Sequence, residues 1–149
     1  MDFVGETLIS GVKLTPLEII AMEGGDVLHA AKMSDEGIIG FGEAYFSKIK
    51  KNMIKAWKRH KEMTLNIIVP LGEIRFVLYD DRSKSPSRGK QFIVDLSLKN
   101  YNRLTVPPMI WMGFQGIGDD INMLLNIASI PHDPPEADRL DIDSIHYDW

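Results

Sequence analysis

Short segments with the period-two pattern of β-strands make up most of this chain. In the segment 74–80 (IRFVLYD) apolar residues recur at every second position, beginning with Ile74 and Phe76. The preceding segment, 66–71 (NIIVPL), is apolar and β-branched and is joined to it by Gly72. Turn-forming residues separate further strand candidates at roughly the 8–12-residue spacing of a sandwich or barrel. These candidates are 17–22, 91–96, 103–106, 110–114 and 122–130.

One lysine-rich segment, 47–62, has an ambiguous pattern. It lacks Gly and Pro, and Ile49, Met53 and Trp57 fit one face of a helix moderately well, so periodicity alone leaves helix and strand open. The other segments all indicate strands. We therefore favour an all-β jelly roll over an α+β fold.

Two regions are rich in residues that interrupt regular structure. The segment 83–90 (SKSPSRGK) is polar and contains turn formers, which predicts an exposed loop. Pro131, Pro134 and Pro135 lie close together and exclude a regular helix across 131–143.

Composition places the chain among ordinary globular proteins. Its 149 residues, 44% hydrophobic and 26% charged, predict one domain over 1–149. There is no cysteine, which excludes disulfides and thiolate metal sites, and the net charge of −4 gives no attraction to nucleic acid or anionic membrane. We find neither a signal peptide nor a membrane-spanning stretch and expect a cytoplasmic protein.

Three blocks occur in order along the chain: 79–89 (YDDRSKSPSRG), 96–107 (LSLKNYNRLTVP) and 109–114 (MIWMGF). In sequence and spacing they resemble the dTDP-4-dehydrorhamnose 3,5-epimerase family of cupins. The block 79–89 (YDDRSKSPSRG) is similar to the family pattern V-D-L-R-x-x-S-P-T-F-G. The block 96–107 is similar to L-S-x-x-N-x-x-x-L-x-I-P, and 109–114 lies where the family has G-F-A-H-G-F. The terminal 147–149 (YDW) is similar to the family's I-x-W, while 25–29 and 41–46 are more similar to an atypical branch.

This resemblance implies a cupin double-stranded β-helix, or jelly roll, in which 47–58 forms strands. It also implies a homodimer that exchanges N-terminal strands, and a dTDP-type nucleotide-sugar ligand. The family's reaction inverts the carbons beside a 4-keto group, which needs a base, an acid on the opposite face and a cation near the developing enolate. We expect no cofactor and no metal.

The positions that carry this chemistry in the family hold other residues here. In the family the base is the histidine of R-G-L-H, held by an aspartate; the matching block is 55–58 (KAWK), so Lys58 replaces it. Met112 replaces a second histidine. The tyrosine acid falls on Leu125 and the enolate-stabilising lysine on Leu65. Loss of one acid or base typically costs roughly 10²–10⁴-fold in rate, so the sequence leaves catalytic activity itself open.

The remaining polar residues define the candidate site. We predict Lys58 and His60 as catalytic residues, on one strand face, and Glu43, Tyr45 and Lys55 as substrate-binding residues. The supporting carboxylate is expected from Asp141 or Asp143, and apolar residues are expected to line a dry barrel: Leu65, Ile67, Ile110, Met112, Phe114 and Leu125.

Several of these residues have a simpler interpretation that stays open. Burial would lower the pKa of Lys58 and let it act as a base; the simpler interpretation, which we favour, is that Lys58 lies solvated or ion-paired at the barrel mouth without a chemical role. The spacing of Lys58 and His60 fits a cupin H-x-H metal motif, for which a protonated lysine is a poor ligand. Trp57 and Trp111 could stack on a nucleotide, or simply be buried. Seven basic residues within 48–61 form either an anion site or a solvated face.

Three functions follow from these readings. The first is a divergent sugar-nucleotide epimerase or isomerase of dTDP-deoxysugar (rhamnose-type) or surface-glycan biosynthesis. The second is a non-catalytic cupin that binds a sugar nucleotide or a partner protein. The third, which the net charge favours least, is a nucleic-acid-binding module that uses the lysine-rich strand.

Overall fold

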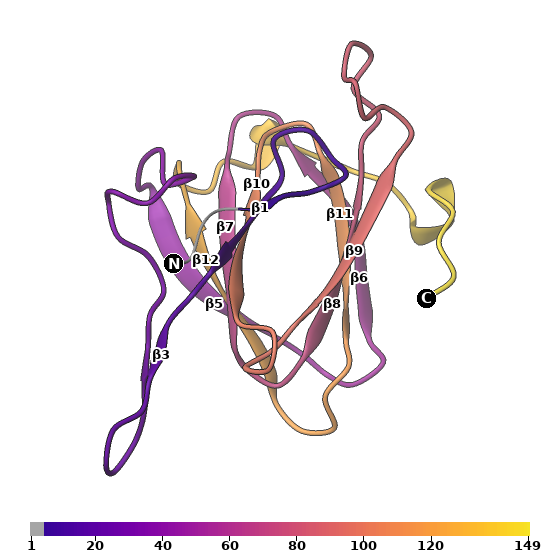
Figure 1. Cartoon of the computed structure of the whole chain (residues 1–149). Coiled ribbons are helices and arrows are strands. Elements are labelled where there is room, and N and C mark those ends of the chain that lie inside the picture. Colours follow the sequence, from indigo (N-terminus) through magenta and orange to yellow (C-terminus); the bar gives the residue numbers. More distant parts are fainter. Residues whose placement is uncertain (1–4) are drawn as a thin grey trace.

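The computed structural model describes residues 5–149, and in this part of the chain two antiparallel sheets face one another (Figure 1). The six-stranded sheet has the order β1-β2-β10-β7-β12-β5. Its strands are β1 (Gly5–Glu6), β2 (Lys13–Pro16), β10 (Asn102–Val106), β7 (Leu65–Leu71), β12 (Asn122–Ala128) and β5 (Glu43–Ile49). The five-stranded sheet has the order β13-β6-β11-β8-β9. Its strands are β13 (Ala137–Arg139), β6 (Ile54–His60), β11 (Trp111–Gly116), β8 (Ile74–Tyr79) and β9 (Gln91–Leu96).

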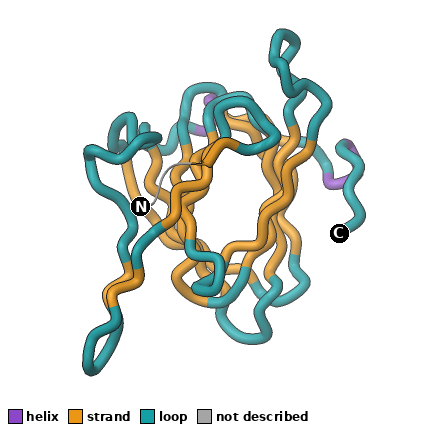
Figure 2. Tube along the Cα trace, in the orientation of Figure 1, coloured by secondary structure: helices purple, strands orange, loops and turns teal. Residues whose placement is uncertain are grey.

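Regular helix is confined to two short 3₁₀ turns, Pro134–Glu136 and Ile142–Ser144, and strands and loops form the rest of the described chain (Figure 2). From β5 to β13 consecutive strands lie in opposite sheets, except for the hairpin β8–β9, and this is the arrangement of a jelly roll. The all-β cupin fold is therefore confirmed. No helix among residues 5–149 is long and apolar enough to cross a membrane.

The lysine-rich segment forms strands β5 and β6, joined by a turn, as the family resemblance implied. Its two strands belong to opposite sheets and both present side chains to the interior of the barrel, which a single helix of the same sequence could not do. The strand expected over 17–22 shrinks to β3 (Ile19–Ile20), which pairs only with β4 (Val27–Leu28). This hairpin projects away from the two sheets (Figure 1), and its apolar residues are exposed.

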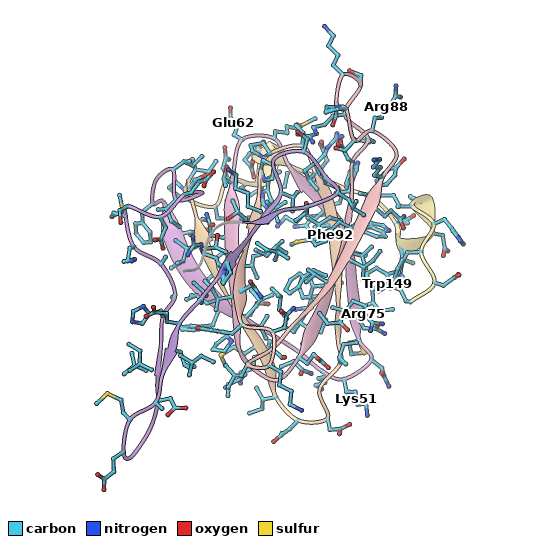
Figure 3. The ribbon with its side chains drawn as sticks, in the orientation of Figure 1. Lys51, Glu62, Arg75, Arg88, Phe92 and Trp149 are labelled. Atoms are coloured by element: carbon cyan, nitrogen blue, oxygen red, sulfur yellow. The ribbon has the colours of Figure 1, made fainter. Side chains whose placement is uncertain are left out.

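Strand β8 is buried on both faces, because two apolar clusters lie on either side of its sheet. Ile74, Phe76 and Leu78 point into the main core between the sheets, where Phe92 also packs (Figure 3). Val77 points outward into a second cluster built from Trp57, Trp111, Ile145, Tyr147 and Trp149. The chain beyond β13 thus covers the outer face of the five-stranded sheet, and the rings of Trp57 and Trp149 lie 5.5 Å apart between centroids.

The loop after β8 is organised by one buried carboxylate, Asp80. Its oxygens accept hydrogen bonds from the Arg82 guanidinium at 2.9 Å, the Ser85 hydroxyl at 2.5 Å and the Ser87 hydroxyl at 2.6 Å. Burial opposes ionisation, but these bonds hold the pKa of Asp80 well below its usual range. The loop itself projects from the barrel and ends at Gly89, as expected for 83–90, and Arg88 points outward from it (Figure 3).

Candidate functional site

A cavity of about 780 Å³ lies mainly inside the barrel, between the inner faces of the two sheets, and its lining extends to Trp57, Leu140, Asp141 and Ser144 beside β6. Strand β6 forms one wall, together with Met112 and Phe114 of β11. The opposite wall comes from β5, β7 and β12, which belong to the six-stranded sheet. The size is that of a small-molecule site, and its lining combines apolar side chains with a few polar ones.

A β-bulge in β6 sets which side chains enter this cavity. Opposite β6, Met112 pairs with Lys58 and Phe114 with Lys55, so three steps along β6 match two along β11. Lys55 and Lys58 therefore both face inward, and His60 follows at the normal spacing of two. The predicted shared face of Lys58 and His60 is confirmed.

Gly113 of β11 makes the bulge sterically feasible. A Cβ on Gly113 would lie 2.6 Å from the Cβ of Ala56 and 3.0 Å from the Trp149 ring. Glycine thus allows β6 to bulge against β11 while the outer aromatic cluster stays packed on the same site.

His60 forms a hydrogen-bonded dyad with Glu136, at the end of the 3₁₀ turn before β13. The Nδ1 atom of His60 contacts Glu136 Oε1, and both side chains are almost fully buried. Glu136 Oε2 also accepts the backbone N–H groups of Glu62 at 2.9 Å and Met63 at 3.0 Å. Burial opposes ionisation of Glu136, yet these hydrogen bonds outweigh it and lower its pKa. An ionised Glu136 keeps the proton of His60 on Nδ1, which leaves Nε2 as a basic nitrogen.

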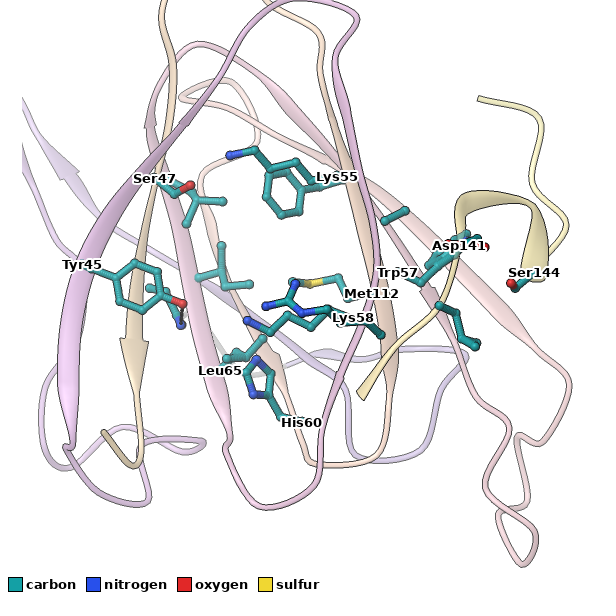
Figure 4. Close-up of a pocket in the computed structure, with 17 residues that line it drawn as sticks. Tyr45, Ser47, Lys55, Trp57, Lys58, His60, Leu65, Met112, Asp141 and Ser144 are labelled. Atoms are coloured by element: carbon teal, nitrogen blue, oxygen red, sulfur yellow. Dashed lines mark hydrogen bonds between the residues drawn. The ribbon is translucent and has the colours of Figure 1, made fainter. Parts of the chain in front are cut away.

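Lys58 lies half-buried beside His60, and both side chains reach into the cavity (Figure 4). Burial is the main cause that lowers the pKa of Lys58; the charge of Arg139 lowers it further, and the charge of Glu136 opposes the shift. Arg139 also lines the cavity, because β13 pairs with β6 in a register that sets it directly opposite Lys58. The site therefore gathers positive charge around an otherwise apolar interior.

The facing wall carries Tyr45 and Ser47 from β5 and Leu124 and Asn126 from β12. The Nδ2 atom of Asn126 donates to the Tyr45 hydroxyl at 3.1 Å. The expectation that Leu125 lines the barrel at the family's tyrosine position is wrong. Side chains alternate along a strand, and it is the neighbours of Leu125 that face the cavity.

Other predicted residues have mixed outcomes. Tyr45 and Lys55 line the cavity, and Lys55 Nζ lies 5.9 Å from the Phe114 ring centroid and 3.1 Å from the Lys48 carbonyl oxygen. Glu43, at the first position of β5, lies beyond the lining residues. Among the expected apolar lining, Leu65, Ile67, Met112 and Phe114 are in place, whereas Ile110 is part of the closed core.

The expected supporting carboxylates take different positions. Asp141 lines the cavity but the structure assigns the contact with His60 to Glu136, and Asp143 is exposed. Trp57 and Trp111 are buried in the outer cluster, with indole N–H groups bonded to the Ile142 carbonyl oxygen and to Asp81. Within residues 5–149, no three His, Asp or Glu side chains converge on a point that could hold a metal ion.

Sequence reasoning missed Glu136, Arg139 and Asn126. Glu136 and Arg139 belong to the proline-rich segment, where spacing gave no register against β6. Asn126 differs from Leu125 by one position, and only the paired register of β12 with β5 and β7 decides which of them faces inward. The available signal was that Asn122 and Asn126, four positions apart, place two polar side chains on the same face of a strand.

The jelly roll encloses a cavity that is lined by cations and by a carboxylate–histidine pair. Such a cavity defines the protein as a cupin with a small-molecule site. A comparison with models of known protein families gives no match. The chain is 30% identical over 139 residues to the "Probable low-salt glycan biosynthesis epimerase Agl13" of Haloferax volcanii, covering 91% of this chain and 89% of that protein. It is 23% identical over 146 residues to the spore coat polysaccharide biosynthesis protein SpsL of Bacillus subtilis, covering 95% and 97%.

Solved structures agree with these relatives. A dTDP sugar isomerase from Desulfovibrio desulfuricans superposes with a TM-score of 0.89 and 39% identity, over 95% of this chain and 89% of that one. An epimerase from Legionella pneumophila, solved with dTDP-4-keto-L-rhamnose, shares the fold with a TM-score of 0.84 and 19% identity, over 95% and 79%. The chain belongs to the dTDP-4-dehydrorhamnose 3,5-epimerase family of sugar-nucleotide epimerases.

Proposed function

We propose that this protein is an epimerase that inverts a carbon next to the ketone of a dTDP-type 4-keto-6-deoxy sugar, in deoxysugar or surface-glycan biosynthesis. One observation carries the proposal. In this protein, a member of the epimerase family, the cavity contains His60, and the Nδ1 atom of His60 is held by the buried carboxylate of Glu136. This arrangement makes Nε2 of His60 a general base, which is the group that removal of a proton beside a ketone requires.

Lys58 supplies the second element of this chemistry. Removal of the proton places negative charge on the ketone oxygen, and a cation in a half-dry site stabilises that charge far more than it would in water. Lys58 lies beside His60 on the same face of β6, so it can reach the oxygen of a sugar whose neighbouring carbon faces His60. Its role is electrostatic, and it leaves proton removal to His60.

The diphosphate of the substrate is assigned to the cations nearer the opening. Lys55 and Arg139 line the cavity and are exposed, as anion-binding side chains at a mouth should be. Leu65, Met112 and Phe114 leave an apolar surface between them for the sugar ring and its methyl group.

Deuterium exchange tests this function. In deuterated water with dTDP-4-keto-6-deoxyglucose, the protein should incorporate deuterium at a carbon flanking the ketone. The variant His60→Gln should lower the rate roughly 10²–10⁴-fold, while His132→Gln, at an exposed histidine, should match the wild type. Exchange no faster than in His60→Gln would contradict the proposal. If dTDP still raised the melting temperature of such an inactive protein, the non-catalytic sugar-nucleotide-binding alternative would replace it.

We also propose that the protein acts as a homodimer in the cytoplasm, where charged sugar nucleotides are retained. The β3–β4 hairpin supports a dimer, because Ile19, Ile20, Met22 and Val27 are each 39–57% exposed on an arm that has no covering element among the described residues. Sedimentation equilibrium should give twice the chain mass, and Ile20→Lys should shift the protein toward monomer. A wild-type monomer at micromolar concentration would contradict this.

A further inference from the structure

Inversion of a carbon needs two groups on opposite sides of the substrate. A base that removes a proton and returns it from the same side only exchanges it with solvent, and the configuration is unchanged. His60 projects from β6 in the five-stranded sheet, so the proton donor must project from the facing, six-stranded sheet. Polar side chains from that sheet that line the cavity are Tyr45, Ser47 and Asn126.

Among these three, Tyr45 has the acidity that proton transfer requires. A phenol gives up and regains a proton far more readily than an aliphatic hydroxyl or an amide, which are the groups of Ser47 and Asn126. Figure 4 shows the Tyr45 ring on one side of the cavity, with Lys58 and His60 reaching toward it from the other. The geometry therefore offers one group of suitable chemistry on the required wall.

The hydrogen bond between Asn126 and Tyr45 determines the direction of the phenolic proton. Asn126 Nδ2 donates to the phenol oxygen at 3.1 Å, so this oxygen acts as acceptor and its own O–H stays available to the cavity. The same bond stabilises a phenolate once the proton has left. Asn126 is only 2% exposed, which fixes its amide in place.

A second observation indicates that a ligand completes this wall. The Oδ1 atom of Asn126 is buried and has no hydrogen-bond partner among residues 5–149. A buried carbonyl oxygen without a partner destabilises the folded protein, and this one borders a cavity. A sugar hydroxyl placed next to Tyr45 would satisfy it.

We propose that Tyr45 is the acid that protonates the substrate carbon opposite His60, and that Asn126 is its positioning residue; this rests on the proposed epimerase function. His60 Nε2 takes the proton, and the C–H electron pair moves into the enolate. The enolate pair then forms a new C–H bond with the Tyr45 proton from the other face, which restores the ketone. The resulting phenolate regains a proton from solvent, and the imidazolium of His60 loses one.

The experiment measures exchange and inversion separately in deuterated water with dTDP-4-keto-6-deoxyglucose. Wild type should give deuterated product of inverted configuration. Tyr45→Phe should lose inversion by roughly 10²-fold or more, while it continues to exchange the hydrogen that His60 removes. The control Phe46→Leu alters the next aromatic residue of β5, which is 64% exposed and absent from the cavity lining, and it should retain both activities.

Asn126→Leu tests the positioning role. It should reduce inversion more than exchange, because only inversion needs the Tyr45 proton in place. A purely structural role would lower both activities together. Melting temperature and dTDP binding confirm that each variant is folded. Inversion at the wild-type rate in Tyr45→Phe overturns this inference alone. A wild type that neither exchanges nor inverts overturns the epimerase function, and the role of Tyr45 with it.

Discussion

The loop after β8 and the interior cavity have departed from the family pattern to very different degrees. In the loop, the residues that match the pattern are the ones that build the buried network: Asp80, Arg82, Ser85 and Gly89 all lie where the family has the same residue type. In the cavity, the matching positions hold Lys58, Met112 and Leu65 in place of residues that carry out the reaction.

The difference reflects how tightly each function constrains its residues. A buried carboxylate is stable only with its full set of donors, so no single member of the Asp80 network can change alone without a large loss of stability. A cavity needs only the right groups on the right walls. His60 lies two residues beyond the family position yet on the same inner face, and its carboxylate contact is Glu136 and neither of the expected aspartates. The fold therefore leaves a clearer trace in the sequence than the reaction does.

The largest effect is expected from breaking the cavity dyad. Glu136→Gln removes the charge that stabilises the imidazolium and the preference for a proton on Nδ1, so deuterium exchange should fall roughly 10³-fold. The matched control is Asp138→Asn, two residues along the chain, whose carboxylate faces outward and accepts from Arg59 at 2.7 Å. Equal loss of exchange in both variants would show that the segment 136–138 matters only for the fold.

The next effect is on stability and comes from the loop. Asp80→Asn leaves Arg82 without its buried partner and should lower the free energy of unfolding by about 3 kcal/mol. Exchange activity of the folded protein should be unchanged, since Asp80 is not part of the cavity lining. Asp119→Asn, in an exposed pair with Lys51, should leave the free energy of unfolding nearly unchanged, because solvent screens a surface ion pair. Urea unfolding of the wild type and the two variants measures both losses of stability. A loss in Asp80→Asn as small as that in Asp119→Asn would show that the loop network is not tightly constrained.

A smaller effect on rate is expected at Lys58. Lys58→Met keeps an unbranched side chain only one atom shorter but removes the cation, so exchange should fall roughly 10²-fold, while Lys58→Arg recovers part of the rate. His60 and Glu136 are untouched in both variants. If Lys58→Met were as inactive as His60→Gln and Lys58→Arg recovered nothing, Lys58 itself would be the base, as the family position suggested.

Much of the fold could be predicted from sequence because short-range pattern and fixed motif spacing determine it. The segment 91–96 coincides with β9, and 74–80 ends within one residue of β8. The strand predicted over 17–22 is longer than the observed β3. An apolar run predicts a buried strand, but Ile19 and Ile20 are exposed in the described chain. The sequence does not predict the short strand β13, because three prolines precede it and it pairs with β6 over only three residues.

The site was predictable only where its residues lie on regular strands. Lys58, His60 and Tyr45 follow from the alternation along β6 and β5. Glu136 is 76 positions from its partner His60, and no local pattern encodes such a contact. Local pattern does not encode strand register either. An error of one residue placed Leu125 in the cavity instead of Asn126, because adjacent side chains of a strand point to opposite faces.

The smallest expected effect is a pH dependence of the stability that Asp80 gives to the loop. Asp80 has a pKa that folding lowers, so its ionised form stabilises the folded state above the unfolded value of ~3.9. This contribution is lost as the pH falls below that value toward the folded pKa. The difference in the free energy of unfolding between wild type and Asp80→Asn should therefore shrink by about 1 kcal/mol between pH 5 and pH 3. Urea melts at both pH values measure it, and a difference that stayed constant would mean that the charge of Asp80 does not hold the loop.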